Sequence, residues 1–406
     1  MDHVCMVVLS LYPQDERVRR QAEALEREGI AVDVICLRGD GQSKTERLGL
    51  VTTYRVIRES SKDDIIRYLY HSLVFMLAAS MRMIGLSFKK KYALVQAHNM
   101  PDFLIFTGLF HKILGRPVVL VLHDLSVELF MSKWAGWKSK ILIPCVKLAE
   151  KLSCRFADHL ITASTGFCDL LAKRGHPSSK TTLVLNTADS NIFHARYERD
   201  FEKIERGAKL LYHGTVVSRF GLANAIRALE IVRRRIPDST LHIYGKYNDG
   251  SRKELRDVAN ELNLSDCVFL HDHRPLEEIC GLIKDADIGL APYLSDIFTN
   301  LILPTKILEY AHMRLPVVAS KLDGIHRVFD EGCVSYVEQR NVDQLADKIT
   351  ELCLNPELRR SLAENAEKAI AELNWPVMAD RYVRLVRQLT QTGPASEMGH
   401  EARPSR

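Results

Sequence analysis

The sequence predicts an α/β protein with two Rossmann-like, doubly wound domains that face each other across a cleft. Three observations support this fold class. The chain has 406 residues, whereas one domain usually has about 100–200. Short apolar runs rich in β-branched residues alternate with longer amphipathic segments, which is typical of βαβ units and a parallel sheet. This alternation stops in a polar stretch and then begins again, so two repeats of similar size lie in series.

The polar stretch sets the expected domain boundaries. Residues 191–208 form the linker between an N-terminal domain over residues 1–190 and a C-terminal domain over residues 209–375. A final helix is predicted over residues 376–391, and the tail over 392–406, which contains Gly, Pro and Ser, is expected to be disordered. The predicted strands cover residues 4–10, 31–36, 93–98, 117–122, 159–163 and 181–185, and then 209–213, 240–244, 268–270, 288–291, 316–319 and 334–337.

Composition and charge exclude several classes of protein. Apolar residues make up 46% of the chain and charged residues 26%, as in a soluble globular protein. The net charge of +5 is small and no nucleic-acid motif accompanies it, so no nucleic-acid partner is expected. None of the nine cysteines lies in a C-x-x-C pair, which predicts reduced thiols in a cytoplasmic protein. The apolar stretch over residues 68–81 is shorter than a membrane span and is expected to be a buried helix.

Ligands of open parallel sheets lie at the carboxyl ends of the strands, so functional side chains are sought just after each predicted strand. In the C-terminal domain, Pro304 or Thr305 can begin a helix, followed by Lys306. The free N–H groups and the dipole of such a helix start favour an anion. Glu309, one turn further, can accept both hydroxyls of a ribose. The alternative is a capped helix with a surface glutamate.

The loop after the first strand of the C-terminal domain is a second candidate. Gly214 and Gly221 allow a tight turn and close approach of a ligand. Arg219, just before a helix, can bind a diphosphate with its forked guanidinium. An ordinary loop with a solvated arginine is the alternative.

In the N-terminal domain, His123 and Asp124 directly follow a predicted strand, with Glu128 close behind. A histidine at this edge can donate to a sugar hydroxyl or assist the leaving group. His98 follows another strand and has the same placement.

Two further motifs exclude other chemistry. The first β-α turn lacks G-x-G-x-x-G, which argues against a dinucleotide oxidoreductase. Asp285 and Asp287 form a D-x-D sequence, but they precede a strand and so lie at the wrong edge of the sheet. Neither a metal nor a cofactor is therefore expected.

Together these segments resemble the family-4 retaining glycosyltransferases, which have the GT-B fold, over about residues 3–390. The matching positions are Tyr12 and Pro13 with Asp15 and Arg17, residues 97–102, residues 122–124, residues 213–221, residues 242–245, residues 287–292 and residues 304–310. The resemblance implies that the final helix packs back on the N-terminal domain.

The same resemblance implies a metal-independent transfer that retains the anomeric configuration. The donor is a UDP- or GDP-linked sugar, and the acceptor is a saccharide or a lipid-linked molecule of polysaccharide or glycoconjugate biosynthesis. Glu309 binds the ribose in this scheme, and Arg219 binds the diphosphate. The donor-binding residues are Gly214, Arg219, Gly245, Pro304, Thr305, Lys306 and Glu309; the catalytic residues are His123, Asp124 and Arg219; and Asp15, Arg17, His98 and Glu128 lie on the acceptor or sugar side.

The sequence departs from the family pattern in three respects. Thr215 and Phe220 stand where the family often has Arg and Lys, Asn300 or Leu301 stands where it often has Glu, and the first β-α turn lacks the usual glycines. Two alternatives therefore stay open: a sugar-nucleotide epimerase or hydrolase on the same fold, and a non-catalytic relative that binds nucleotide-sugar.

A membrane contact is also considered. Trp134 and Trp137 are interleaved with Lys133, Lys138 and Lys140, which is typical of an amphipathic element on an anionic bilayer. A domain helix with a solvated face is the alternative. The membrane interpretation places the protein peripherally on the inner face of the membrane, with a lipid-linked acceptor.

Overall fold

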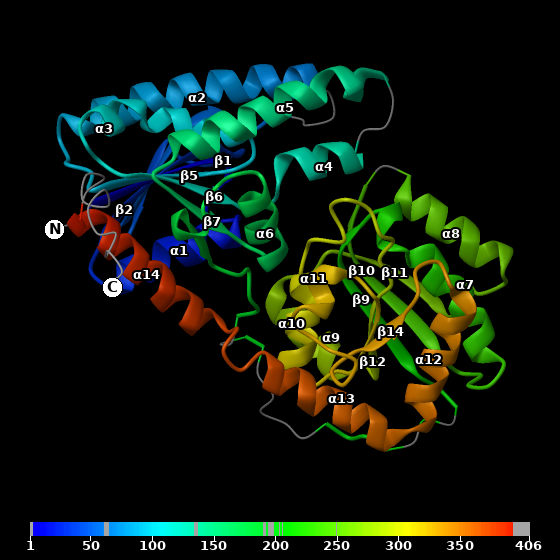
Figure 1. Cartoon of the computed structure of the whole chain (residues 1–406). Helices are drawn as coiled ribbons and strands as arrows, with labels where there is room; N and C mark the ends of the chain where they lie inside the picture. Colours follow the sequence, from blue (N-terminus) through cyan, green and yellow to red (C-terminus); the bar gives the residue numbers. More distant parts are fainter. Residues whose placement is uncertain are drawn as a thin grey trace, which may run out of the picture. The chain divides into compact units, whose positions relative to one another are not determined.

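The computed structural model describes residues 3–60, 65–133, 137–189, 192–193, 199–202, 204, 206–248 and 250–392. The chain forms two compact units (Figure 1): unit 1 comprises Met1–Leu185 with Pro376–Arg406, and unit 2 comprises Asn186–Trp375. Much of the expected linker and all of the tail after residue 392 lie outside the described residues. The expected α/β fold with two parallel-sheet domains is confirmed.

Unit 1 is built on an eight-stranded sheet with the order β3-β4-β2-β1-β5-β6-β7-β8. Only β3 and β4 pair in an antiparallel manner. Outward from β1 the order runs in opposite directions, so the topological switch point lies between β1 and β5. The strands are β1 (His3–Leu11), β2 (Ala31–Arg38), β3 (Thr45–Leu48), β4 (Val51–Arg58), β5 (Leu94–His98), β6 (Val118–Leu122), β7 (His159–Thr162) and β8 (Thr181–Leu183).

The hairpin of β3 and β4 is absent from the sequence prediction. Gly49 makes its turn with a φ of 59°, and β4 then adds to β2 in parallel. Its β-branched Val, Thr and Ile side chains are typical of a strand, but two arginines within β4 weaken the apolar signal. Arg55 is nevertheless buried, and its guanidinium donates to Tyr12 O (3.2 Å) and Glu46 Oε2 (2.6 Å).

The helices of unit 1 include a C-terminal one that returns from unit 2. Tyr382 on that helix donates to Gln96 Oε1 (2.9 Å), and Arg381 donates to Leu183 O (3.1 Å). Helix α14 is thereby fixed to unit 1. The helices are α1 (Glu16–Arg27), α2 (Ile65–Ser87), η1 (Asp102–Gly108), α3 (Leu109–Ile113), α4 (Ser126–Lys133), α5 (Trp137–Phe156), α6 (Thr165–Lys173), η2 (Ser178–Lys180) and α14 (Trp375–Thr392).

Helix α2 corrects one expectation. The apolar stretch over 68–81 is not a buried helix but the middle of a 23-residue helix that is long and apolar enough to cross a membrane by length and composition. Only 28% of its most apolar window is buried. The buried positions, which pack on the sheet and on η1, are Ser72, Phe75, Ala79, Met83 and Leu86.

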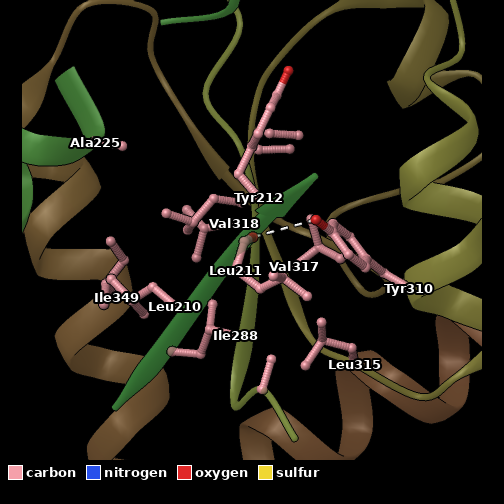
Figure 2. Close-up of a cluster of buried hydrophobic side chains, with 14 of the residues drawn as sticks. Leu210, Leu211, Tyr212, Ala225, Ile288, Tyr310, Leu315, Val317, Val318 and Ile349 are labelled. Atoms are coloured by element: carbon pink, nitrogen blue, oxygen red, sulfur yellow. Dashed lines mark hydrogen bonds between the residues drawn. The ribbon is translucent and has the colours of Figure 1, made fainter. Parts of the chain in front are cut away.

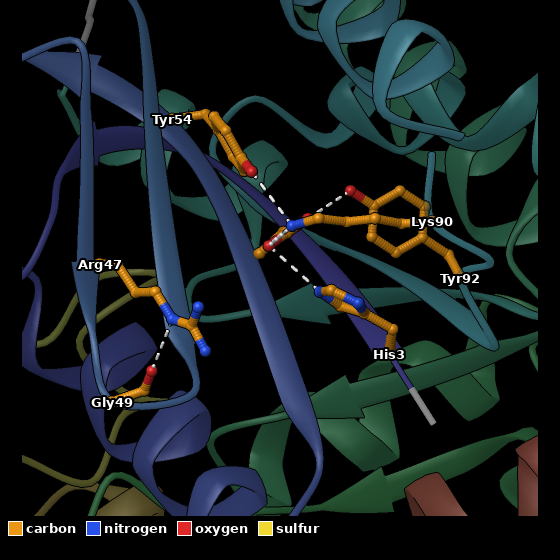
Figure 3. A network of polar contacts seen from close by, with 7 residues as sticks. His3, Arg47, Gly49, Tyr54, Lys90 and Tyr92 are labelled. Carbon is orange, nitrogen blue, oxygen red and sulfur yellow. Dashed lines mark hydrogen bonds and ion pairs between the residues drawn. The ribbon is translucent and has the colours of Figure 1, made fainter. Parts of the chain in front are cut away.

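A network of polar side chains lies at the amino-terminal edge of the sheet in unit 1, opposite the edge at which ligands are expected (Figure 3). The carboxylate of Asp33 accepts from Lys90 Nζ (2.9 Å) and from the Tyr92 hydroxyl (2.5 Å), and it pairs with His3 Nε2 (3.1 Å). Burial raises the pKa of Asp33, but the hydrogen bonds from His3, Tyr92 and Lys90 hold it below its usual value. Since His3 begins β1, this network is structural and lies away from the ligand edge.

Unit 2 is an entirely parallel sheet with the order β11-β10-β9-β12-β13-β14. Taken along the chain, this is the 3-2-1-4-5-6 order of the dinucleotide-binding fold, with its switch point between β9 and β12. The strands are β9 (Lys209–Val216), β10 (Thr240–Tyr247), β11 (Val268–Asp272), β12 (Ile288–Ala291), β13 (Val317–Ser320) and β14 (Ser335–Val337). The helices are η3 (Ser218–Phe220), α7 (Leu222–Arg233), α8 (Ser251–Glu261), α9 (Leu276–Lys284), α10 (Thr305–His312), α11 (Asp323–His326), α12 (Val342–Leu354) and α13 (Pro356–Ala369).

The core of unit 2 surrounds β9 (Figure 2). Ala225 and Ile349 lie on one side of the sheet, and Tyr310 lies on the other, where its hydroxyl donates to Leu211 O (3.3 Å). Both faces of β9 are therefore covered, as expected for a parallel strand. Asp287 Oδ2 accepts from Lys209 N (2.7 Å) and so holds the start of β9, a structural role for the D-x-D sequence. The carboxyl end of β9 is a rigid base for the residues that follow.

Candidate active site

Two glycines lie side by side at the carboxyl ends of the central strands of unit 2. Gly214 on β9 is in register with Gly245 on β10, and Gly214 has a φ of 116°. A Cβ on Gly245 would lie 1.9 Å from Gly214 O, so the two backbones approach too closely for any side chain there. This contact positions the turn that leaves β9.

A buried lysine lies against this turn. Lys306 Nζ donates to the hydroxyls of Tyr293 (2.5 Å) and Tyr212 (3.3 Å) and lies 4.3 Å from the centre of the Tyr212 ring. It also lies 5.5 Å from the centre of the Phe220 ring, which stacks on Tyr293. A Cβ on Gly214 would lie only 3.3 Å from Nζ. Burial lowers the pKa of Lys306 to about 7, although Glu309 opposes the shift.

Glu309 lies one turn further along α10 and is also buried. Its Oε2 lies 3.0 Å from His213 Nε2 on β9. Neither atom has a hydrogen-bond partner among the described residues. An unsatisfied buried carboxylate oxygen costs about 1–3 kcal/mol. Ligand hydroxyls can supply the missing donors.

The loop after β9 is joined to the segment after β12. Arg219 is half-buried, its guanidinium lies 5.4 Å from the Phe298 ring centre, and its carbonyl accepts from Leu294 N (2.8 Å). Gly221 has a φ of 69°, and a Cβ there would lie 1.9 Å from Pro292 O. The loop is thus held close to the switch point between β9 and β12.

Helix α10 begins at Thr305, with Pro304 as its N-cap and no side chain capping its first turn. The eight-residue helix therefore directs uncapped backbone N–H groups from the same turn that carries Lys306. The start of α10 thus has the backbone groups that the predicted anion site requires at Pro304 and Thr305, and their role stays a prediction.

Of the departures from the family pattern, Phe220 and Asn300 have structural explanations, and nothing in the structure explains the threonine at position 215. Phe220 forms a wall of the aromatic cage around Lys306. Asn300 Nδ2 donates to Asp323 Oδ2 (2.8 Å), and Asp323 N donates to Asn300 Oδ1 (3.1 Å), which holds the start of α11. Thr215 is exposed, and its carbonyl accepts from the Tyr212 hydroxyl (2.6 Å).

In unit 1, two histidines meet at the carboxyl ends of β5 and β6. The rings of His98 and His123 stack with their centres 5.2 Å apart, and His98 Nδ1 lies 3.0 Å from His123 Nε2. His123 N donates to Asn99 Oδ1 (2.8 Å), which fixes the backbone. Burial lowers the pKa of His98 to about 3 and that of His123 well below its ordinary value, so both rings are neutral at pH 7.

An ion pair lies in the turn after β1. Arg17 donates to both carboxylate oxygens of Asp15 (3.0 Å each), and Ser10 adds a third hydrogen bond (3.1 Å). Burial raises the pKa of Asp15, but Arg17 outweighs it and holds the pKa well below its usual value. Burial lowers the pKa of Arg17, whereas Asp15 and Asp124 raise it further. Asp15, Arg17 and Asp124 thus form one charged group near the histidine pair.

Glu128 does not join this group. It is buried and pairs with Arg174, whose guanidinium also donates to Glu150 (2.5 Å). Burial raises the pKa of Glu150 to about 7. The contacts of Glu128 are those of a structural ion-pair network, which corrects the expectation that it lies on the acceptor side.

The sequence predicted Lys306 as a donor-binding residue through its backbone amide, but it did not predict the position of its ammonium and did not select His213 or Asn99 as site residues. The ammonium had a usable signal, since a lysine one turn before Glu309 points to the same region of α10. Among the described residues, no group of three or more His, Cys, Asp or Glu side chains could hold a metal ion.

The class of protein follows from the fold and the site. Two Rossmann-type units, one of which has a buried lysine, an unsatisfied carboxylate and a glycine turn at its switch point, define a two-domain α/β protein with a candidate ligand site. The family model of Glycosyltransferase Family 4 matches residues 15–191, and that of glycosyl transferases group 1 matches residues 195–369. The chain belongs to the group 1, family-4 glycosyltransferases and has the GT-B fold.

Curated relatives are distant. The D-inositol 3-phosphate glycosyltransferase of Corynebacterium jeikeium is 25% identical over 52% of this chain and 52% of its own length. The alpha-D-kanosaminyltransferase of Streptomyces kanamyceticus is 24% identical over 64% of this chain and 67% of its own length. The chain spans about half the length of the corynebacterial relatives that it matches.

Solved structures share the fold over nearly the whole chain. Sucrose-phosphate synthase from Thermosynechococcus elongatus has a TM-score of 0.75 at 18% identity, with 96% of this chain and 99% of that chain covered. Anabaena HepE in complex with UDP has a TM-score of 0.70 at 16% identity, with 96% and 100% covered. At these identities the likeness shows the fold alone.

Proposed function

We propose that this glycosyltransferase takes a UDP- or GDP-linked sugar in unit 2 and transfers it, with retention of configuration and without a metal, to a saccharide or lipid-linked acceptor. The observation that carries the proposal is the buried pair on α10. Lys306 and Glu309 both lie at the switch point of the sheet, next to Gly214. Because the two side chains lie one turn apart, Lys306 can bind the diphosphate of a nucleotide while Glu309 accepts hydrogen bonds from the ribose hydroxyls of the same nucleotide.

The diphosphate is assigned to Lys306, to Arg219 and to the start of α10. With a pKa of about 7, Lys306 is half-protonated in neutral solution, and a phosphate beside it draws the amine to its charged form. The uncapped N–H groups at Thr305 add neutral donors. These groups stabilise the departing diphosphate, the role a metal ion has in other transferases.

The ribose is assigned to Glu309, because its buried Oε2 has no hydrogen-bond donor among the described residues. Two ribose hydroxyls would satisfy it. The HepE structure contains UDP, which makes UDP the first nucleotide to test.

Unit 1 supplies the residues assigned to the sugar. His123 donates a hydrogen bond to the transferred sugar, with the charged group of Asp15, Arg17 and Asp124 nearby. In the proposed reaction the acceptor hydroxyl attacks the anomeric carbon on the face from which the diphosphate leaves. The bond from carbon to phosphate oxygen breaks, and the acceptor's proton passes to that phosphate.

A thermal-shift experiment with UDP, GDP and ADP tests the donor site. The right nucleotide at a hundred times its Kd should stabilise the wild type by about 2.7 kcal/mol. Glu309→Gln loses a hydrogen bond to a charged group, worth about 1.5–3 kcal/mol, so its affinity should fall about 10- to 150-fold. Glu351→Gln, at an exposed position on α12, is the matched control and should bind as the wild type does.

No shift with any nucleotide at millimolar concentration would contradict the donor assignment and favour the non-catalytic alternative. The products formed from a nucleotide-sugar distinguish a transferase from an epimerase or hydrolase. Conversion of the nucleotide-sugar in the absence of any acceptor would indicate the epimerase or hydrolase.

The membrane surface is assigned to helix α2. The segment first considered lies largely outside the described side chains, because those of residues 134–141 are not described. On α2, Ile66 is 75% exposed, Met81 69% and Phe88, just after the helix, 84%. The exposed apolar positions recur at helical spacing along one stripe: Ile66, Tyr70, Leu73, Leu77, Met81 and Phe88.

The charge around this stripe supports an anionic lipid surface as its partner. Residues 65–91 contain five Lys or Arg and no Asp or Glu. Exposed Lys147, Lys151 and Arg155 lie on α5, and both α5 and α2 (Figure 1) contact η1. Lys90 is bound to Asp33 and is not counted as part of this surface. An apolar stripe with basic flanks is the pattern of a helix that lies in a bilayer interface.

Vesicle sedimentation tests the membrane surface. The double variant Leu73→Glu with Leu77→Glu should lose at least tenfold in binding to vesicles of equal parts phosphatidylglycerol and phosphatidylethanolamine, since each leucine contributes roughly 1.5–3 kcal/mol when fully buried. Leu48→Glu with Leu354→Glu, at exposed positions away from α2, is the control and should bind normally. Equal loss in both pairs, or no wild-type binding at low salt, would contradict the assignment.

A further inference from the structure

A buried chain of hydrogen bonds joins the C-terminal helix to His123. The Tyr382 hydroxyl on α14 donates to Gln96 Oε1 (2.9 Å), and Gln96 Nε2 lies 2.9 Å from His98 Nε2. His98 Nδ1 in turn lies 3.0 Å from His123 Nε2. Gln96 Nε2 also donates to Gln21 Oε1 (2.7 Å). All five side chains are buried.

The chemistry of the amide gives this chain a direction. An amide nitrogen can only donate, so His98 Nε2 must accept from Gln96. A neutral His98 ring then carries its proton on Nδ1 and donates it to His123 Nε2. His123 Nε2 is therefore an acceptor, and the proton of the neutral ring is on Nδ1. That nitrogen makes no hydrogen bond within the described part of the chain.

We propose that Gln96, oriented by Tyr382 and Gln21, is a positioning residue that sets the tautomer of His123 and presents its Nδ1–H to the ligand as a donor. We call this series of hydrogen bonds from Tyr382 to His123 the relay. It requires neutral rings at His98 and His123, and the burial of both histidines provides them. The relay needs α14, so the C-terminal helix acts on a residue at the end of β6.

The consequence for catalysis rests on the proposed function. A histidine held with Nδ1 protonated can stabilise a sugar or phosphate oxygen by donation, but it cannot take the acceptor's proton at that nitrogen. The relay thus assigns the proton to the donor phosphate and gives His123 an electrostatic role.

Two isosteric variants, Gln96→Glu and Gln21→Glu, distinguish an effect of hydrogen-bond direction from an effect of side-chain packing. Gln96→Glu replaces the donor with an acceptor, so His98 Nε2 must carry the proton, and His123 must then donate from Nε2 and leave Nδ1 bare. Gln21→Glu adds the same charge to the same network, yet its carboxylate accepts from Gln96 as before. The second variant preserves the direction and is the matched control.

The tautomers are read by long-range ¹⁵N–¹H correlation of the imidazole nitrogens in the full-length protein, with His123→Asn used to assign the signals. We expect protonated Nδ1 at His123 in the wild type and in Gln21→Glu, and protonated Nε2 in Gln96→Glu. The Gln96→Glu protein should lose about 100-fold or more in kcat, while its nucleotide affinity stays within about threefold of the control.

The wild-type spectrum alone can overturn the proposal, since a protonated Nε2 at His123 would contradict it whether or not a variant folds. An unchanged tautomer in Gln96→Glu would do the same. Tyr382→Phe, which removes only the hydroxyl that orients the amide, should show a mixture of tautomers. If the tautomers are as proposed but no variant or wild-type protein transfers sugar, the proposed function fails and the relay stands.

Discussion

Replacing Lys306 with methionine will make the unliganded protein more stable and will remove its nucleotide binding. The ammonium is buried among Tyr212, Phe220 and Tyr293, and burial lowers its pKa to about 7 from the ordinary value of 10.5. Apolar replacement of a buried charge of similar volume commonly stabilises by about 1–4 kcal/mol. Because the same cation is assigned to the diphosphate, the gain in stability accompanies a loss of at least about 100-fold in affinity for UDP.

The gain in stability expected for Lys306→Met should depend on pH. Between pH 7 and 10.5 the unfolded lysine binds a proton that the folded one releases, so wild-type stability rises with pH across this window. The cost of burying the charge is fully present below pH 7. The advantage of Lys306→Met should therefore be largest below pH 7 and shrink toward pH 10.5.

Urea unfolding at several pH values, with and without UDP, measures both effects. Lys253→Met, at an exposed lysine on α8, is the matched control and should change neither stability nor binding. A destabilised Lys306→Met protein would show that the cage stabilises the ammonium, and unchanged UDP affinity would remove Lys306 from the site.

The second large effect is expected at Gly245. In Gly245→Ala the new Cβ would lie 1.9 Å from Gly214 O, and the neighbour is backbone, which cannot turn aside as a flexible side chain can. The strands β9 and β10 must separate, so we expect a loss of about 2–3 kcal/mol in the free energy of unfolding. Displacement of Gly214 should also weaken nucleotide binding.

Gly281→Ala on α9 is the matched control, since a Cβ there would meet nothing within 4 Å. Alanine is the better helix former, so this variant should gain about 0.5–1 kcal/mol. Equal stability of Gly245→Ala and wild type in urea unfolding would show that the strands have room at their carboxyl ends.

Sequence reasoning succeeded where a local pattern decides the structure. The rule that ligands lie at carboxyl ends selected His123, Gly214 and Glu309, whose role in a ligand site stays a prediction. The alternation of apolar runs and amphipathic segments predicted both parallel sheets. It did not find β3 and β4, because the charged side chains of this hairpin hide its alternation. It also expected α2 to be buried, because hydropathy does not say whether another element covers a helix.

Glu128 illustrates the limit for single residues. Its place just after β6 suggested a functional side chain, but Arg174 just after α6 and Glu150 on α5 bind it into a structural network. Partners that lie 22 or more positions away along the chain cannot be inferred from spacing alone.

By itself, the sequence determined the fold class, the order of the strands along the chain and the residue types available at each strand end, because these follow from local periodicity and composition. Only the tertiary structure decided the state of those residues. The pKa of Lys306 depends on aromatic rings from three separate segments, and the proton of His123 depends on Tyr382 from the far end of the chain. Desolvation and the direction of a hydrogen bond are set by neighbours in space, which folding alone brings together.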